Sequence, residues 1–237
     1  SMPRGTKQLA KLAIFNAHQV IENKIGTSDK YHHAMKNLAK HLGLDKTSIL
    51  IEGYDISHHS GKYAVASAVQ FSNNGPNKKA YKLYNIPSRY AGNDVGSIKH
   101  VLQRRLQRAG EDNLPDIILI DGGLAQLNSA LGVLHSNQGS QPLVLSIVKG
   151  AKRVRATETI LSKDGVLEIP KDSPGFVLLQ QVRDESHRFA ITSNRKKKNK
   201  SISYSRLDSV YGLGPQKKQE LLRFFKSLQS IKNAPIE

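Results

Sequence analysis

A short apolar run that ends in an aspartate and two glycines constrains the fold of this chain most. Residues 116–121 read DIILID, and Gly122 and Gly123 follow directly. Uninterrupted apolar runs of this length are typical of strands that are buried on both faces, as in parallel sheets. A second such run, PLVLSIVK, covers residues 142–149, and a helix is expected between the two near residues 124–136. The region therefore predicts a strand–helix–strand unit with parallel strands.

Three β-rich segments precede this unit in close succession, at residues 48–57, 63–72 and 79–86, and turn residues separate them. Such close spacing predicts an antiparallel meander. The pattern predicts three further elements: a helix over 93–109, a hairpin over 158–169 and a helix over 173–192. This order predicts an α/β fold, an RNase H-like mixed sheet in which three antiparallel strands are extended by parallel strands and flanked by helices.

The two ends of the chain are expected to lie outside this sheet. Apolar residues at helical spacing predict helices over 6–24 and 29–43. The tract RKKKNKSISYS predicts an exposed linker, because a run of like charges cannot bury itself. We therefore expect four parts: a helical lead-in (1–45), the RNase H-like domain (46–193), a basic linker (194–205) and a small all-α helix-hairpin-helix motif (206–237).

The charge of the chain is strongly positive and unevenly distributed. The chain has 36 Lys and Arg residues against 19 Asp and Glu residues, a formal net charge of +17. The net charge is +11 over residues 1–110, −3 over 111–187 and +10 over 188–232. Basic arms around an acidic centre suit an enzyme that grips a phosphate backbone and gathers metal at carboxylates. A generally basic surface without a bound partner is the alternative. In the helix over 93–109 we expect the basic residues to face outward: Lys99, Arg104, Arg105 and Arg108.

The composition excludes several classes of protein. The chain has no cysteine, which excludes disulfide scaffolds and cysteine-ligated zinc. No apolar run approaches the roughly 18 residues that a membrane span needs, and no signal-peptide pattern opens the chain. We expect a soluble cytoplasmic protein that takes neither a membrane nor a small molecule as its partner. Ser1 and Met2 resemble a cloning scar, so we expect natural sequence upstream.

Aspartates fall where an RNase H-like sheet would bring them together. Asp55 lies in the middle of the first expected strand, Asp121 ends the fourth, and Asp94 begins the first helix of the fold. Because the first and fourth strands of such a sheet are neighbours, Asp55 and Asp121 should project side by side. Two uncompensated carboxylates would repel each other. Mg²⁺ or Mn²⁺, which prefer hard oxygen ligands, would neutralise both.

Some of these residues also have ordinary structural explanations. Asp94 follows Asn93 and can belong to a helix cap, and Asp121 before two glycines can be a turn residue. Asp55 is harder to explain in this way, because a charged side chain inside an apolar strand is costly unless it is paired or metal-bound.

His187 lies late in the last helix of the fold, in the motif RDESHRFA. Its imidazole can ligate a metal or move a proton at neutral pH, and it can equally be a packed or surface histidine. Asp184, three residues earlier, shares its helix face. Asp184 and Glu185 are alternative ligands or supporting groups.

The C-terminal segment predicts a motif that grips a DNA backbone. Glycines at 212 and 214 let the backbone approach a phosphate closely, and the amides at the next helix N-terminus bind it. A plain helical hairpin with a glycine turn is the alternative. The apolar side of that next helix is expected at Leu221, Leu222, Phe225 and Leu228. The predicted DNA contacts are Lys149, Arg183, Arg195, Lys196, Lys197, Lys198, Lys200, Gly212, Gly214, Lys217 and Lys218.

Several longer motifs occur in order along nearly the whole chain: GYDISHHSG, PDIILIDGGLAQLN, KDSP, RDESHRFAI followed by a lysine run, and GLGPQKKQELL. Together they resemble the C-terminal half of the UvrC family, a component of the excinuclease of bacterial nucleotide excision repair. The resemblance implies an RNase H-like endonuclease followed by tandem helix-hairpin-helix motifs. Such an enzyme cuts DNA on the 5′ side of a lesion that is held in a UvrB–DNA complex.

The resemblance also implies roles for individual residues. It places the metal-binding Asp-Asp-His set on Asp55, Asp121 and His187, and a further functional aspartate on Asp94. It implies that the N-terminal GIY-YIG nuclease and the UvrB-binding segment lie outside this chain, and that a second hairpin motif breaks off at 233–237.

Two rival functions stay open from the sequence. One is a DNA-binding scaffold whose nuclease fold no longer cuts. It predicts that an acidic or histidine position of the site is lost, whereas the three aspartates and the histidine are all present. The other is a junction-resolving or transposase-like nuclease of the same fold, which would prefer a four-way junction as its substrate.

Overall fold

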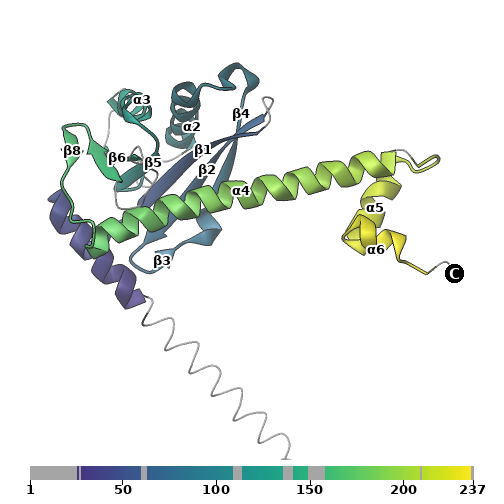
Figure 1. The fold of residues 1–237 in the computed structure, drawn as a ribbon, viewed down its shortest axis with the longest axis horizontal. Helices are drawn as coiled ribbons and strands as arrows, with labels where there is room; N and C mark the ends of the chain where they lie inside the picture. The colour runs from purple at the N-terminus through teal and green to yellow at the C-terminus, as the bar shows by residue number, and fades with distance from the viewer. Residues whose placement is uncertain are drawn as a thin grey trace, which may run out of the picture. The chain divides into compact units, whose positions relative to one another are not determined.

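The computed structural model describes residues 26, 28–59, 63–108, 114–135, 141–148, 158–208 and 210–235. The helix expected over residues 6–24 and the DNA contact expected at Lys149 lie outside these residues. The chain divides into two compact units, Ser1–Ala190 and Ile191–Glu237. Figure 1 shows the first unit as a sheet with helices packed on it and the second as a group of helices.

The first unit is built on one mixed sheet. Its described strands are β1 (Ile51–His59), β2 (Tyr63–Ser72), β3 (Gly75–Pro76), β4 (Lys82–Ile86), β5 (Ile117–Asp121), β6 (Leu143–Val148), β7 (Thr159–Ser162) and β8 (Gly165–Leu167). The strand order is β3-β2-β1-β5-β6-β7-β8, and β4 also pairs with β2. β1 is antiparallel to β2 and parallel to β5, which is parallel to β6. This confirms the expected meander extended by parallel strands.

The third strand of the meander is shorter than its sequence predicts. The strand expected over 79–86 begins at Lys82, because Lys78–Ala80 form a short 3-10 helix, η1. The two-residue strand β3 pairs with the end of β2 instead. Gly75 in β3 has a φ of 90°, a conformation that favours glycine, so the chain turns there before it enters η1.

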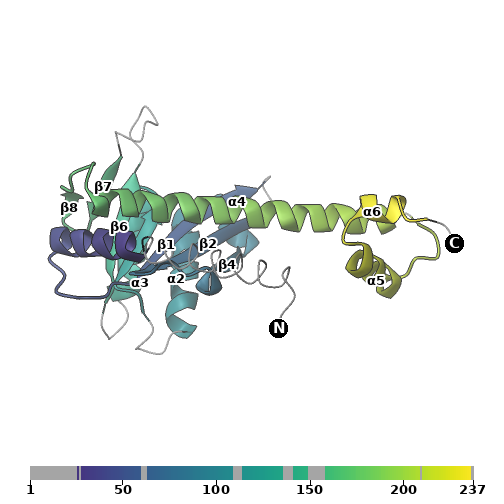
Figure 2. The same cartoon turned by 90° about the horizontal axis from the view of Figure 1, so that it is seen from below.

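Helices cover both faces of the sheet (Figure 2). α2 (Asp94–Arg108) and α3 (Leu124–His135) pack on one face, and the helix of residues 28–42 packs on the other with the first part of α4 (Pro174–Asp208). Strand alternation divides the core in the same way. Ile117 and Leu119 of β5 belong to the cluster beneath α4, whereas Ile118 and Ile120 belong to the cluster beneath α2 and α3.

The helix α4 crosses β1 at Gly53. A Cβ atom at Gly53 would lie 2.5 Å from Cγ1 of Val182 and 3.2 Å from Cγ2 of Val69. Close-packed interiors leave no room for such an atom. The absence of a side chain at Gly53 therefore sets how closely α4 approaches the sheet.

Gly53→Ala is expected to lower the free energy of unfolding by about 1–3 kcal/mol, because the added methyl group overpacks this contact. Urea unfolding followed by circular dichroism measures the change. The matched control is Gly132→Ala in α3, where a Cβ atom meets nothing within 4 Å. The control is expected to stabilise the helix by about 0.5–1 kcal/mol. If both variants unfold like the parent protein, the close approach at Gly53 does not limit packing.

The end of α4 differs from the sequence prediction. The sequence predicts that this helix ends near residue 192, but its backbone continues to Asp208, so residues 194–205, expected as a basic linker, have helical backbone. Lys and Arg are good helix formers, and a helix can expose charges all round, so a charge run and helical backbone are compatible. The boundaries of the four expected parts stay predictions.

The second unit contains two further helices. α5 covers Pro215–Phe225 and α6 covers Leu228–Lys232. The prediction that Leu228 continues the apolar side of the first of these helices is wrong. Lys226 has a φ of 63°, which ends α5, and the Ser227 hydroxyl accepts from the amide of Ser230 and caps α6. Among the described helices of the chain, none combines the length and hydropathy that crossing a membrane requires.

Candidate metal centre

Two aspartates meet where the pairing of two neighbouring parallel strands ends. The register of β1 with β5 pairs Tyr54 with Ile120. The next residue on each strand is an aspartate, Asp55 on β1 and Asp121 on β5. Because alternation sends both side chains to the face that α4 covers, their carboxylates project side by side. The strand arrangement predicted for these two residues is present in the fold.

The helix α4 adds the third side chain. Val182 of α4 contacts Gly53 of β1. His187 is five residues beyond Val182, about 7.5 Å further along the helix axis. From Gly53, two strand residues rise about 6.6 Å to Asp55. The two paths end together, and His187 Nδ1 lies 3.5 Å from Asp55 Oδ2. One ligand atom from each of Asp55, Asp121 and His187 lies within 4.8 Å of the others.

The donor set of this group fits a divalent metal ion. Asp55 is only 6% exposed, and its Oδ2 accepts a hydrogen bond of 2.9 Å from Ser57 Oγ. Asp121 is half-buried, and the side chain of His187 is 52% exposed. The two carboxylates are ligands that hard divalent cations take, the imidazole is a ligand common to first-row divalent metals, and the exposed side leaves access for a substrate. The three residues are therefore suited to hold such an ion.

Asp94 lies at the same edge of the sheet but outside this group of three. β4 is antiparallel to β2 and therefore runs in the direction of β1, so α2, which follows β4, begins at the edge where Asp55 lies. Asp94 is the first residue of α2 and is half-buried. The cap of this helix is its neighbour Asn93, whose Oδ1 accepts from the amide of Gly96 at 2.8 Å.

Arg183 does not lie where a phosphate could reach it, which corrects the sequence prediction. It is 3% exposed, and its guanidinium pairs with Glu158, itself 3% exposed, and with Asp184 at 2.6 Å. Burial works to lower the pKa of Arg183, but the hydrogen bonds and charges of Asp184 and Glu158 outweigh it and raise that pKa. Arg183 therefore ties α4 to the segment before β7.

The other acidic residues of the same motif also have partners of their own. Glu185 accepts from Arg188 at 2.6 Å and from Tyr81 Oη at 3.1 Å. The bond from Arg188 is the main cause that lowers the pKa of Glu185. Asp184 pairs with Arg183, so neither Asp184 nor Glu185 belongs to the group of three ligands. Their alternative assignment as metal ligands is not supported.

The predicted DNA contacts of the second unit are placed only in part. Arg195, Lys196, Lys197, Lys198 and Lys200 lie on helical backbone of α4. Gly212 has a φ of 79°, the left-handed conformation that the hairpin interpretation requires. Gly214 is the N-cap of α5, with Lys217 exposed and Lys218 half-buried in its first turn.

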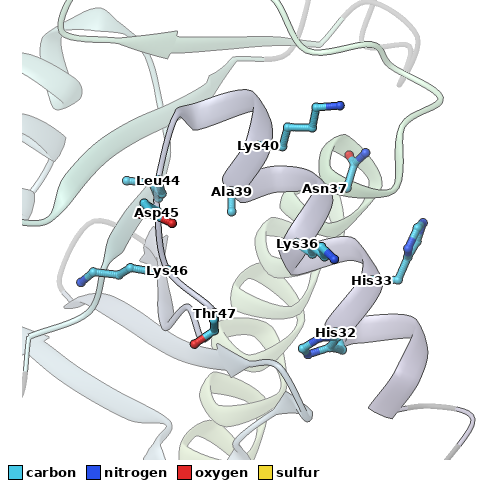
Figure 3. Close-up of a pocket in the computed structure, with 10 residues that line it drawn as sticks. All are labelled: His32, His33, Lys36, Asn37, Ala39, Lys40, Leu44, Asp45, Lys46 and Thr47. Carbon is cyan, nitrogen blue, oxygen red and sulfur yellow. The ribbon is translucent and has the colours of Figure 1, made fainter.

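A hollow of about 740 Å³ lies elsewhere on the first unit. Figure 3 shows its lining, which comes from the helix of residues 28–42 and from residues 44–47. Several of these side chains are basic: His32, His33, Lys36, Lys40 and Lys46. Because residues 44–47 precede β1, the hollow lies at the opposite end of that strand from Asp55. The candidate metal centre is an open edge of the sheet and not this hollow.

The domain is an α/β domain of the RNase H-like class. Its sheet is an antiparallel meander extended by parallel strands, and β1 and β5, which join the two parts, carry the carboxylates. The chain belongs to one family within that class, the UvrC RNase H endonuclease domain, whose family model matches residues 39–191.

The names of the chain's relatives are consistent with membership of this family. UvrABC system protein C of Pseudomonas syringae pv. syringae (strain B728a) is 39% identical over 99% of this chain, and that of Pseudomonas putida (strain W619) is 38% identical. The chain spans 39% of the length of these relatives. Among solved structures, Ciona intestinalis Endonuclease V in complex with inosine-containing DNA is 18% identical with a TM-score of 0.31, covering 44% of this chain and 46% of that one. A likeness at that score supports no conclusion about function.

Proposed function

We propose that this chain is a divalent-metal-dependent DNA endonuclease that makes the incision on the 5′ side of a lesion in nucleotide excision repair. The observation that carries the proposal is the meeting of Asp55, Asp121 and His187 within 4.8 Å at the edge of the parallel strands. Membership of the UvrC endonuclease family supports the substrate, double-stranded DNA with a lesion, and the partner, UvrB.

Asp55, Asp121 and His187 would hold Mg²⁺ or Mn²⁺. When bound, such an ion supplies positive charge that stabilises the phosphate oxygens as a phosphodiester is displaced. Asp55 is buried and oriented by the Ser57 hydroxyl, so its carboxylate stays fixed at the base of the site. His187 is half-exposed beside it, and its imidazole serves either as the third ligand or as a proton carrier during hydrolysis. Asp94 acts at the same edge as a further catalytic carboxylate.

The second unit supplies backbone grip in this proposal. Backbone amides at the start of α5 face DNA phosphates, and this approach depends on the left-handed backbone conformation of Gly212 and on the N-cap Gly214. Positive charge comes from Lys217 and Lys218. The basic residues from Arg195 to Lys200 add salt-dependent affinity. None of these groups reads base edges, which suits an enzyme that must act beside lesions in any sequence.

The proposal is tested on a 5′-labelled duplex that carries one bulky lesion and a nick on the 3′ side of that lesion. The chain is added with and without preloaded UvrB, in Mg²⁺, Mn²⁺ or EDTA, and a four-way junction is run in parallel. A metal-dependent cut on the 5′ side of the lesion is expected. Preferential cutting of the junction would favour a resolving nuclease instead. If DNA is bound but never cut, even after the N-terminal region of a full-length relative is fused to the chain, a non-cleaving scaffold replaces the proposal.

A further inference from the structure

The segment that forms β4 and α2 is unusually basic. Residues 77–108 contain eight Lys and Arg residues and one acidic residue, Asp94. Arg105 points inward and is buried against Glu52, contrary to its expected outward position. The other cations of α2 lie on its outer side, so the helix separates one structural arginine from a charged surface.

Three side chains, one histidine and two arginines, form a line along α2. His100, Arg104 and Arg108 follow one another at four-residue intervals, about 6 Å of rise each, and therefore share one helix face. The Arg104 guanidinium lies 5.8 Å from the ring centroid of Tyr84 on β4, beside which α2 packs (Figure 1). Arg89, just before α2, lies 4.9 Å over the ring of Tyr90, which in turn packs on His100. We name Arg89, His100, Arg104 and Arg108 the α2 stripe.

Among the described residues, the arginines of the stripe have no acidic partner. Within the described part of the chain, no carboxylate forms an ion pair with Arg89, Arg104 or Arg108. Aromatic rings pack against two of the guanidinium groups, of which Arg89 is exposed and Arg104 is half-buried. Burial lowers the pKa of His100, and the positive charges of Arg104 and Arg89 lower it further, so both arginines act on the site of His100.

The stripe begins near the end of the strands that carry the candidate metal centre, on the face of the sheet opposite to α4, and leads away from that end. α2 begins with Asp94 at the edge of the sheet where Asp55 and Asp121 lie, and it runs from there toward Arg108. By helical rise, His100 lies about 9 Å and Arg108 about 21 Å from Asp94 along the axis. Along the axis of the duplex, one DNA strand advances about 3.4 Å per phosphate. The length from His100 to Arg108, about 12 Å, therefore spans several consecutive phosphates.

The surface fits a nucleic-acid backbone better than a protein. A protein interface has an apolar, often aromatic centre. Here the one exposed large apolar residue of α2 is Val95, at its first turn, and Tyr84 beneath Arg104 is 3% exposed. The stripe therefore offers charge and N–H donors with little apolar surface to bury.

We propose that the α2 stripe binds the phosphate backbone of DNA and leads a strand into the metal centre formed by Asp55, Asp121 and His187. This inference rests on the proposed nuclease function and adds a DNA-binding surface on the first unit to the one proposed for the second.

The test measures DNA binding by the whole chain in EDTA, by fluorescence anisotropy with a short labelled duplex at several salt concentrations. Arg89→Gln/Arg104→Gln is expected to bind more weakly and to lower the slope of log K against log salt by about 0.9 for each phosphate that the protein no longer neutralises, or roughly 1.8. The matched control, Lys36→Gln/Lys40→Gln, removes the same charge from the hollow at the other end of β1. The control slope is expected to stay within experimental error of the parent. The proposal is overturned if both double variants bind DNA equally weakly, or if Arg89→Gln/Arg104→Gln binds DNA as tightly as the parent. In the second case an acidic protein would be the next partner to test.

A second measurement does not depend on charge. Because the chain contains no cysteine, a single cysteine can carry a photo-crosslinker at a chosen site. Gln107→Cys, on exposed surface beside the stripe, is expected to crosslink to the duplex, and Lys36→Cys is not. Absence of a crosslink from the first, or equal crosslinks from both, contradicts a stripe-specific path. Since neither measurement needs a metal or a cut, a chain that binds through the stripe but never cleaves would refute the nuclease proposal alone.

Discussion

Asp55→Asn is expected to reduce DNA cleavage by about 10³-fold or more while DNA binding stays unchanged. The substitution keeps the size of the side chain and an oxygen that can accept from Ser57, but it removes the buried negative charge that would hold a divalent ion. Electrostatic stabilisation by a metal contributes several kcal/mol to a phosphoryl displacement, which corresponds to a rate loss of this size. Single-turnover cleavage of the nicked lesion duplex measures it, with anisotropy in EDTA as the binding control.

The same variant has a readout that does not need cleavage. Asp55 and Asp121 bring two carboxylates close together, and their repulsion is relieved by an ion or by removal of one charge. The parent protein should therefore gain thermal stability on addition of Mn²⁺, by about 2.7 kcal/mol at a hundredfold excess over Kd, and Asp55→Asn should gain almost none. Asp164→Asn, at an exposed acid of the β7–β8 turn, serves as the control and should respond like the parent. A normal response to Mn²⁺ in Asp55→Asn would show that the ion binds elsewhere.

Arg105→Leu is expected to cost about 3–5 kcal/mol of unfolding free energy, the largest stability effect that we predict, because it leaves Glu52 buried without its counter-charge. Arg105 donates to both oxygens of Glu52, at 3.0 Å from Nε and 2.8 Å from Nη2, and both side chains are under 10% exposed. Burial works to lower the pKa of Arg105, and the hydrogen bonds and charge of Glu52 outweigh it. Tyr54 adds a further bond to Glu52 of 2.7 Å.

The neighbouring residue provides the control for this experiment. Arg104→Leu makes the same chemical change one position away on the outer side of α2, where a cation–π contact contributes about 0.5–1 kcal/mol. Urea unfolding of both variants, and of Glu52→Leu/Arg105→Leu, separates the pair from its surroundings. The double variant is expected to recover part of the stability, because both charges are then gone. Similar destabilisation by Arg104→Leu and Arg105→Leu would contradict the burial argument.

The sequence predicted the strand order and the meeting of Asp55 with Asp121, because both depend on regular features. Apolar runs mark strands, and alternation fixes the face on which a residue lies. The structure also brings His187 to the same place, where the sequence left its role open. Its position depends on where α4 crosses the sheet, and that is set by the close contact of Gly53 with Val182, which no local pattern shows.

Arg105 and Arg183 were placed wrongly for a common reason. Each is a charged residue on a helix, and the sequence does not say which side of a helix faces an acid that is distant in the chain. Glu52 and Glu158 are those acids, 53 and 25 residues away. For Arg105 a signal existed, because Glu52 stands inside an apolar strand and needs a cation as partner. For Arg183 we find no such signal in the sequence.

The candidate metal centre joins ligands that are anchored in two different ways. Asp55 and Asp121 are carried by adjacent strands whose spacing is fixed by backbone hydrogen bonds, whereas His187 is carried by a helix that is held to the sheet by side-chain packing. Changes in the packing beneath α4 therefore shift the imidazole nitrogen relative to a rigid pair of oxygens. An ion bound at this centre would have two fixed ligands and one movable ligand, so substitutions of core residues that never contact the ion would alter the cation preference.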